Sequence, residues 1–302
     1  MKILLIYYTG TFNTRYLTNL VKDRFISQGD EVDTIEINSH TKVIDTSSYQ
    51  LIGFSYPIYG FNAPLPFDQY VKKLTFNSSQ KYFIYKNSGE VLKMNNASSR
   101  ILIRHMRKFK TKLIGEYHYV MPYNIHFPFE KEFVKQILIY NDKLLDIMFH
   151  NFKTNKIHKI KSNLIYNVGA FFVGIQKIGG NVNSFLYKVD KNKCINCNKC
   201  VNACPHDNIY VKDGAIKFHH HCDMCMRCSF FCPTNAIHIG FLEGWKVNGA
   251  YHFNQIKNDP TISSSYITKD SKGFYKCFIK YYQSIDEEYS KIKDVSIKNL
   301  FD

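Results

Sequence analysis

No run of apolar residues in this sequence is long enough to cross a membrane. The longest uninterrupted stretches, such as Val168 to Ile175, fall far short of the roughly 20 residues that a membrane-spanning helix needs. An export signal is not evident either, because the apolar run Ile3 to Tyr8 is short and no small-residue cleavage site follows it. We therefore expect a cytoplasmic protein without a membrane span.

The sequence also lacks the common nucleotide-binding fingerprints. It contains neither GxGxxG nor GxxxxGK[ST], so a dinucleotide fold and a P-loop are not expected. No set of residues indicates a nucleophile or a general acid and base, which favours an electron carrier over an enzyme. The formal charge is +15, from 40 basic and 25 acidic residues, and suggests nucleic acid, a membrane surface or an acidic partner. Because the basic stretches lack a recognised nucleic-acid module, we expect redox partner proteins, with an acidic docking partner as one option.

What the sequence has in abundance is cysteine. Its 302 residues favour about two domains, and its nine cysteines, without an export signal, indicate metal binding rather than disulfides. Eight of them form two runs of CxxCxxCxxxCP, and the second run repeats the first 28 positions later. The runs comprise Cys194, Cys197, Cys200, Cys204 with Pro205, and Cys222, Cys225, Cys228, Cys232 with Pro233.

This spacing is typical of proteins with two cubane clusters. Three cysteines in a tight turn bring their sulfurs to one face, and the fourth, beside proline, ligates the other cluster. One [4Fe-4S] cluster is thus expected on Cys194, Cys197, Cys200 and Cys232, and the other on Cys222, Cys225, Cys228 and Cys204. Structural zinc is the alternative, but it has no use for a third cysteine at this interval. The lone Cys277 and the histidines 219–221 are not expected to be ligands. The dipeptide Asp213-Gly214 predicts a hairpin between 208–212 and 215–218.

Before residue 150, short apolar runs alternate with segments of helical spacing. This pattern predicts a doubly wound α/β parallel sheet. The expected strands are Ile3–Tyr8, Val32–Ile37, Leu51–Tyr56, Lys81–Tyr85 and Leu113–Met121. The expected helices lie near Leu17–Phe25, Pro66–Leu74, Ala97–Phe109 and Glu130–Phe149.

Three loops that follow these strands carry binding chemistry. The hydroxyl-rich loop Thr9–Thr14 opens a helix and can bind a phosphate through backbone N–H groups. The aromatic loop Tyr56–Pro64 lies where the strand order should reverse, and a ring there can stack on a flat heterocycle. Asn87–Glu90 supplies a third, polar loop. Ordinary helix caps and turns are the competing interpretation.

Together these residues resemble a known arrangement. The amino-terminal half is similar to flavodoxins, whose phosphate loop reads [T/S]xTGxT, and the whole chain resembles the flavodoxin–ferredoxin fusions known as EFR1-family ferredoxins. The matching stretches are Thr9–Thr14, Tyr56–Pro64 and Cys194–Ile237. The resemblance implies a flavodoxin-like doubly wound sheet followed by a small α+β ferredoxin-like domain with two [4Fe-4S] clusters.

The resemblance also implies that FMN binds to the first domain. Its phosphate would be held by Thr9, Gly10, Thr11, Asn13 and Thr14, Tyr59 would stack on the isoalloxazine, and Asn87, Ser88 and Gly89 would approach the polar edge of the ring. One position departs from the pattern, because Phe12 replaces the second glycine of the loop. Glycine there permits unusual backbone angles and close approach to the phosphate, so a large side chain can tighten, redirect or abolish flavin binding.

These expectations define four segments and a function. They are a flavodoxin-like domain (1–155), a packed connecting segment (156–185), a ferredoxin-like domain (186–245) and an unassigned tail (246–302), for which wrapping of the ferredoxin-like domain is one option. The predicted function is transfer of low-potential electrons through two clusters to or from FMN. The alternatives are a ferredoxin carrier with an empty flavodoxin-like docking domain, and a flavin-dependent reductase of a small acceptor.

Overall fold

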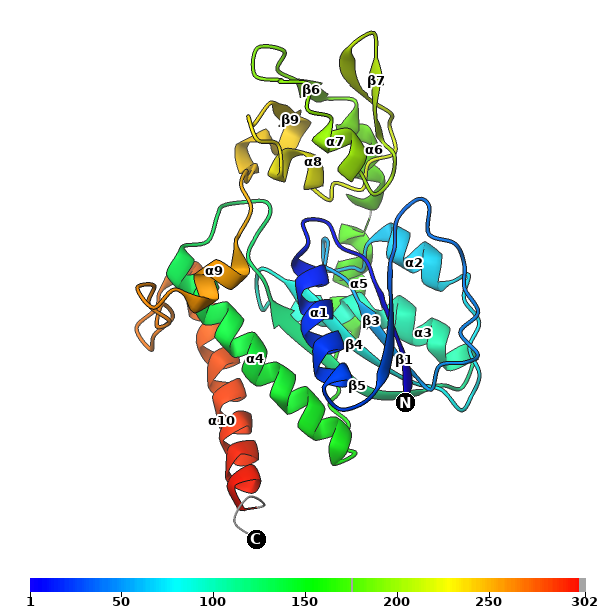
Figure 1. Ribbon diagram of the computed structural model, residues 1–302, viewed down its shortest axis with the longest axis vertical. Coiled ribbons are helices and arrows are strands. Elements are labelled where there is room, and N and C mark those ends of the chain that lie inside the picture. The colour runs from blue at the N-terminus through cyan, green and yellow to red at the C-terminus, as the bar shows by residue number, and fades with distance from the viewer. Residues whose placement is uncertain (175, 299–302) are drawn as a thin grey trace.

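A larger α/β domain lies beneath a smaller domain that covers one end of its sheet (Figure 1). The computed structural model describes residues 1–174 and 176–298. Ile175 of the predicted connecting segment and residues 299–302 of the predicted tail lie outside the described residues.

The larger domain is built on a five-stranded sheet in the order β2-β1-β3-β4-β5, with every neighbouring pair parallel. The strands are β1 (Lys2–Tyr7), β2 (Glu31–Glu36), β3 (Leu51–Ser55), β4 (Lys81–Ser88) and β5 (Lys112–Val120). They overlap the five predicted strands, with bounds that differ by up to three residues. This order is that of the flavodoxin-like fold, and it reverses beside β1 and β3, so their carboxyl ends flank the crevice where ligands of such sheets bind.

Helices cover both faces of the sheet, as predicted for a doubly wound fold. On one face, α1 (Asn13–Ile26) and α4 (Lys131–Lys153) pack on side chains such as Ile3 and Leu5. On the other, α2 (Leu65–Val71) and α3 (Arg100–Lys108), the latter preceded by the 3₁₀ helix η1 (Lys93–Ser99), pack on side chains such as Leu4 and Phe54. The buried strands are apolar on both faces for this reason.

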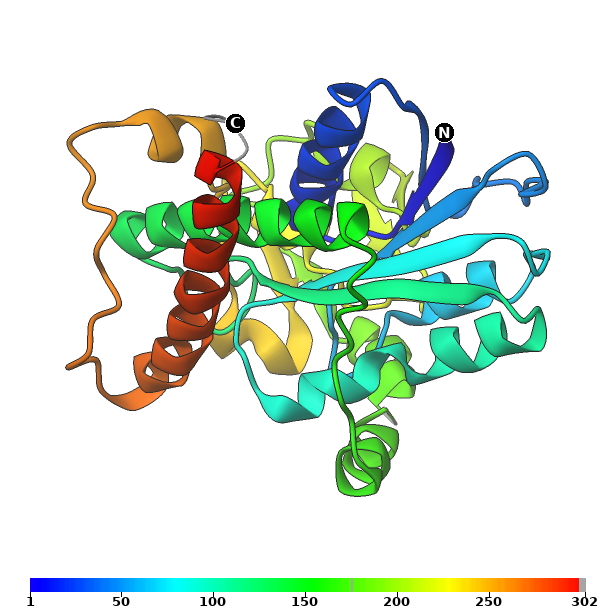
Figure 2. The same cartoon turned by 90° about the horizontal axis from the view of Figure 1, so that it is seen from below.

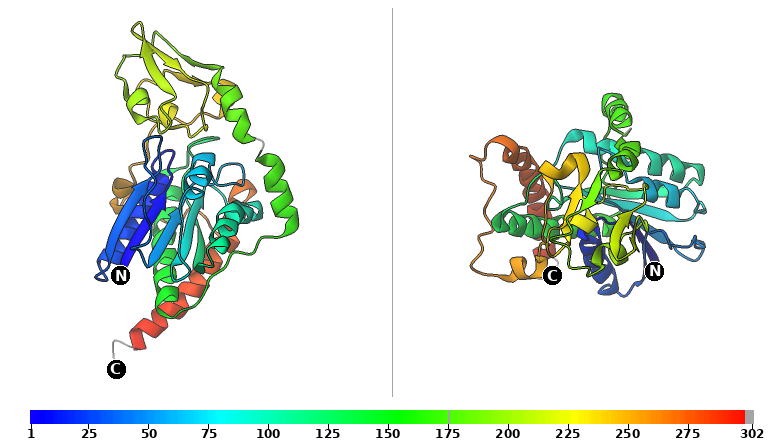
Figure 3. Two further views of the ribbon diagram at one scale, coloured as in Figure 1. Left: turned by 90° about the vertical axis from the view of Figure 1, so that its right-hand side faces the viewer. Right: turned by 90° about the horizontal axis from the view of Figure 1, so that it is seen from above.

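Two helices, α5 (Leu164–Val173) and α6 (Gln176–Ser184), lead from the larger domain to the smaller one. They run along the outside of the molecule, where α5 packs against η1 (Figure 3, left). Of the residues of α5, Ala170 is buried, whereas Leu164, Ile165 and Phe171 are exposed. The connecting segment is therefore helical and packed on one side only.

The smaller domain consists of two short antiparallel pairs and two short helices. Strand β6 (Tyr187–Val189) pairs with β9 (Ile237–Ile239), and β7 (Ile209–Lys212) pairs with β8 (Ala215–Phe218). The helices are α7 (Lys199–Ala203) and α8 (Arg227–Phe230). The predicted hairpin is confirmed, because Asp213 and Gly214 join β7 to β8 with φ of 51° and 70°. Both positive values are those of the tight turn that Asp-Gly favours.

The final segment returns to the larger domain. It contains η2 (Gly240–Trp245), α9 (Phe253–Asn258), η3 (Gly273–Tyr275) and α10 (Lys276–Lys298). Helix α10 lies against α4, where Phe278, Tyr282 and Ile285 are buried (Figure 2). In the part of the chain that the structure describes, the tail contacts the ferredoxin-like domain only near its start, where Asn248 donates to the carbonyls of Ser229 (2.7 Å) and Cys232 (2.9 Å). From α9 onward its apolar face completes the core beside α4 and does not wrap the ferredoxin-like domain. Among the described residues, no helix has the length and apolar character to cross a membrane.

Candidate functional site

The two cysteine runs adopt the same backbone conformation. Positive φ values occur at Asn196 and Asn198 in the first run, and at Met224 and Met226 at the equivalent places in the second. These left-handed residues curl each CxxCxxC segment into a tight turn, so that side chains near one another in sequence face one space. The duplication in sequence is therefore a duplication of local structure.

The eight cysteines lie in two groups. The tight turn of each run gathers its first three cysteines, and its fourth cysteine lies beside the other run. One small cavity is lined by Cys194, Cys197, Cys200 and Cys232, and a second by Cys204, Cys222, Cys225 and Cys228. Each group thus contains three cysteines of one run and the last cysteine of the other. This is the crosswise grouping that the spacing predicts.

Hydrogen-bond donors and apolar side chains surround the two cysteine groups. Backbone N–H groups of Asn208 and Ala236, which occupy equivalent places in the repeat, donate to the sulfurs of Cys204 (3.3 Å) and Cys232 (3.2 Å). Burial raises the pKa of Cys222 to about 12, so without a metal this thiol keeps its proton. Among the described residues, no three His, Cys, Asp or Glu side chains converge closely enough to hold a single ion.

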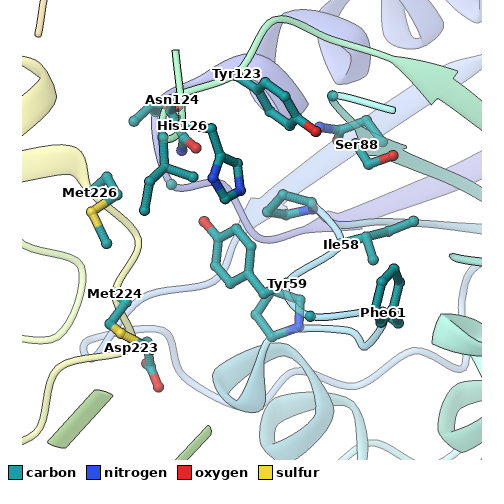
Figure 4. A pocket seen from close by; sticks show the side chains of 18 of the residues that line it. Ile58, Tyr59, Phe61, Ser88, Tyr123, Asn124, His126, Asp223, Met224 and Met226 are labelled. Carbon is teal, nitrogen blue, oxygen red and sulfur yellow. Dashed lines mark hydrogen bonds between the residues drawn. The ribbon is translucent and has the colours of Figure 1, made fainter. Parts of the chain in front are cut away.

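A larger cavity of about 620 Å³ lies between the domains. It is at the carboxyl ends of β1, β3 and β4, and its volume is in the range of cofactor sites. The nine residues expected to bind FMN all line it: Thr9, Gly10, Thr11, Asn13, Thr14, Tyr59, Asn87, Ser88 and Gly89. The structure thus brings the three predicted loops to one space (Figure 4).

Several polar groups of this cavity have no partner among the described residues. The hydroxyls of Thr9 and Tyr59 are buried and make no hydrogen bond. Burial raises the pKa of the Tyr59 hydroxyl well above its usual value, so the group remains a donor. The first N–H groups of α1 also lack intrahelical acceptors. By contrast, Thr14 donates to Oδ1 of Asn87 (2.8 Å), which joins the first loop to the third. The free donors suit an anionic, flat ligand.

Phe12 adopts backbone angles that favour glycine. Its φ is 70° and its ψ is 3°, in the left-handed region. The ring lies 5.0 Å from that of Phe231, and the guanidinium groups of Arg15 and Arg227 lie 4.1 and 4.7 Å from its centroid. The side chain therefore packs on the smaller domain.

The second cysteine run is fastened to the loop Thr9–Thr14, the predicted phosphate loop. Arg227 donates through Nε to the carbonyl of Gly10 and through a terminal nitrogen to that of Thr9, both at 2.6 Å. A Cβ placed on Gly10 would lie only 2.7 Å from the carbonyl oxygen of Cys225. Asn124 bridges the same two elements, donating to the Thr11 hydroxyl (3.0 Å) and to the Cys225 carbonyl (3.5 Å).

A second polar contact joins the domains nearby. Nε2 of His206 lies 2.8 Å from a carboxylate oxygen of Asp223 and 3.0 Å from the hydroxyl of Tyr8 at the end of β1. Tyr8 is fully buried. The cavity and the second cysteine group are thus adjacent parts of one site.

Sequence reasoning missed residues from two places that line the large cavity. Tyr123 and Asn124 follow β5, and the rule that ligands bind beyond strand ends could have found them. Met224 and Met226 occupy variable positions of the second cysteine run and face the cavity from the other domain (Figure 4). No local signal in the sequence indicates that pairing.

Known proteins resemble the two parts of the chain separately. A family model described as a 4Fe-4S binding domain matches residues 187–210. An uncharacterised ferredoxin of Methanocaldococcus jannaschii is 41% identical over 56 residues, which cover 17% of this chain and 73% of that protein. Oxidised flavodoxin 1 of Bacillus cereus (14% identity, TM-score 0.34) aligns with 47% of this chain and 95% of its own. An archaeal flavodoxin (13% identity, TM-score 0.35) aligns with 50% and 99%.

The parallel sheet in the order 2-1-3-4-5 and the 4Fe-4S binding domain above its carboxyl ends define a protein with one flavodoxin-like and one ferredoxin-like domain. The ferredoxin domain and the flavodoxin-like fold support electron transfer. The chain belongs to the ferredoxin family, in which it is a flavodoxin–ferredoxin fusion. The predicted fusion is confirmed.

Proposed function

We propose that this protein is an electron carrier that holds two [4Fe-4S] clusters, one in each cysteine group, and FMN in the cavity between the domains. The observation that carries the proposal is the position of the second cysteine group directly against the phosphate loop. When bound, the clusters supply one-electron transfer and the flavin supplies transfer of one or two electrons.

The cysteine groups support the cluster assignment by their geometry. In each group, four cysteine sulfurs surround a small cavity. A cubane cluster needs this arrangement, because its four irons occupy a volume, whereas a single metal ion needs ligands that meet at one point. Cys204 and Cys232 accept backbone N–H bonds, which stabilise the thiolate form. In the second group, where Cys225 is buried, Tyr187 and Met226 help to keep water from the sulfurs.

The large cavity supports the flavin assignment by its chemistry. The N-terminal end of α1 and the hydroxyls of Thr9 and Thr11 offer donors to a phosphate. Tyr59 and Tyr123 provide aromatic faces, and Met224 and Met226 close the cavity from the ferredoxin-like domain. Such a site would orient a flat ring between the two domains and shield it from water.

The first cysteine group faces outward and suits contact with a partner. Cys197 is exposed, and the neighbouring Ile195 is 62% exposed. Exposed lysines flank it in the sequence at 188, 191 and 199. Complementary charge raises the rate of encounter, so the proposed redox partner presents an acidic face to this end of the molecule.

Metal analysis of single variants tests the cluster assignment. Anaerobically purified protein should contain about eight irons, that is, two cubanes. Cys197→Ser and Cys225→Ser should each remove about half of the iron, from different groups, because a serine oxygen is a poor substitute for a thiolate. Cys277→Ser is the matched control and should keep all of it, since Cys277 lies outside both groups. Zinc in place of iron, or full iron in Cys197→Ser, contradicts the assignment.

Flavin extraction tests the second half of the proposal. Gly10→Ala should lower the FMN content several-fold, because the added Cβ would lie 2.3 Å from the Tyr59 hydroxyl and 2.7 Å from the Cys225 carbonyl. Gly244→Ala is the control, since a Cβ there meets no atom within 4 Å. If the purified wild-type protein neither contains FMN nor binds it when it is added, the flavodoxin-like domain is an empty docking module.

A further inference from the structure

Helix α5 carries an apolar face that the other described residues leave uncovered. Leu164 and Ile165 are each 77% exposed, Phe171 is 66%, Phe172 is 63% and Val168 is 45%. At about 100° per residue these five side chains fall within roughly a third of the helix circumference. A helix at the surface of a globular protein normally turns such a stripe inward.

The orientation of α5 is fixed by the contacts of its opposite side. Gly169 lies against Met94 of η1, where an added Cβ would be 2.8 Å from the methionine methyl group. The carbonyl of Ala170 accepts a hydrogen bond of 2.8 Å from Asn62. Small residues therefore hold the helix on the larger domain, and the large apolar ones must project outward. In Figure 2 the helix protrudes from the edge of the molecule.

The chain around α5 has charge of one sign. Between Asp146 and Asp190 the sequence contains no acidic residue. The exposed lysines directly before the helix are Lys159 and Lys161. Lys156, further back, is paired with Glu288 on α10 at 2.8 Å. An apolar stripe bordered by lysines is the pattern of helices that lie in the interface of a membrane with anionic lipids.

We propose that α5 and the lysines before it bind the surface of an anionic lipid bilayer. The apolar stripe enters the boundary between headgroups and acyl chains, while the lysines stay among the lipid phosphates. A second copy of the chain is a poorer occupant, because a parallel twofold contact through α5 would bring the two lysine segments of the same sign together, and an antiparallel one would leave them without a partner of opposite charge. The proposal is independent of the cofactors and goes beyond electron transfer.

Vesicle flotation of the full chain tests this. The protein should float with vesicles of phosphatidylcholine containing about 30% phosphatidylglycerol, but not with phosphatidylcholine alone, and raised salt should reduce binding several-fold. Ile165→Glu and Phe172→Glu should each lower the partition coefficient about tenfold or more. Val43→Glu, at an exposed apolar residue in a loop of the larger domain, is the control and should bind as the wild type does.

Two results would overturn the proposal. One is wild-type protein that stays unbound at low salt with anionic vesicles. The other is a dimer in sedimentation that Ile165→Glu dissociates, which would assign the stripe to a second copy. Because both substituted side chains are exposed, the circular dichroism of the variants should match that of the wild type.

Discussion

Substitution of Arg227 by lysine tests the contact that joins the domains. The Arg227 side chain is almost fully buried and donates to three carbonyl groups, those of Thr9, Gly10 and Ala203. One of its terminal nitrogens also lies 3.4 Å from the carboxylate of Glu36. Lysine keeps the charge but cannot present donors in the planar fork that reaches all of these acceptors.

The size of the effect follows from the hydrogen bonds that are lost. If the ammonium keeps one carbonyl, two bonds from a charged donor disappear, each worth about 1.5–3 kcal/mol. The carbonyls of the loop Thr9–Thr14 that lose their donor stay buried between the domains, and this lowers the free energy of unfolding further. We expect Arg227→Lys to lower the free energy of unfolding by about 3–6 kcal/mol. For a chain of this length that is a fall in Tm of about 5–9 °C.

The assay is thermal unfolding of the anaerobic holoprotein at one scan rate, followed by circular dichroism. Arg107→Lys is the matched control, because Arg107 is exposed on α3, and its Tm should stay within about 1 °C of the wild type. Equal melting temperatures for the two variants would refute the reasoning, since Arg227 would then not fasten the loop. The FMN content should fall only in Arg227→Lys.

Substitutions at three further positions test other parts of the structure. Phe12→Gly and Phe12→Ala both lose the contact with Phe231, but only glycine relieves the positive φ, so the glycine variant should be more stable to urea by about 0.5–1 kcal/mol. Burial lowers the pKa of His118 to about 3. Below about pH 6.5 the unfolded chain therefore binds more protons than the folded chain. The free energy of unfolding should fall as the pH drops from 6 to 4, by up to about 1.4 kcal/mol per pH unit. His118→Gln should flatten that slope in urea titrations; an unchanged slope assigns it to other groups. Phe278→Ala should lower the free energy of unfolding by about 3–5 kcal/mol in the same assay, because the Phe278 ring, on α10, is fully buried. A loss below about 1 kcal/mol would mean that the tail does not stabilise the fold.

The strands and the cysteine groups could be predicted because each depends on a local pattern. A strand buried on both faces is a continuous apolar run, and the cysteine spacing is set by the turn around one cluster. The docking of α10 on α4 could not be predicted, because apolar periodicity shows that a helix has a buried face but not which partner covers it. The contacts of Arg227 with the larger domain were missed for the same reason, since the carbonyls of Thr9 and Gly10 lie more than two hundred residues away in the sequence.

The replacement of glycine by Phe12 is explained by the neighbouring domain. Glycine in such a loop permits a positive φ and leaves space for the ligand. The positive φ of Phe12 destabilises the fold by about 1–2 kcal/mol. Its contact with Phe231 stabilises the fold by about 0.5–1.5 kcal/mol. Arg15 and Arg227 stabilise the ring further. The side chain leaves the cavity open because the ferredoxin-like domain receives it, so Phe12 does not argue against a flavin there. A flavodoxin-like domain on its own would expose this ring, which ties the departure from the loop pattern to the fusion.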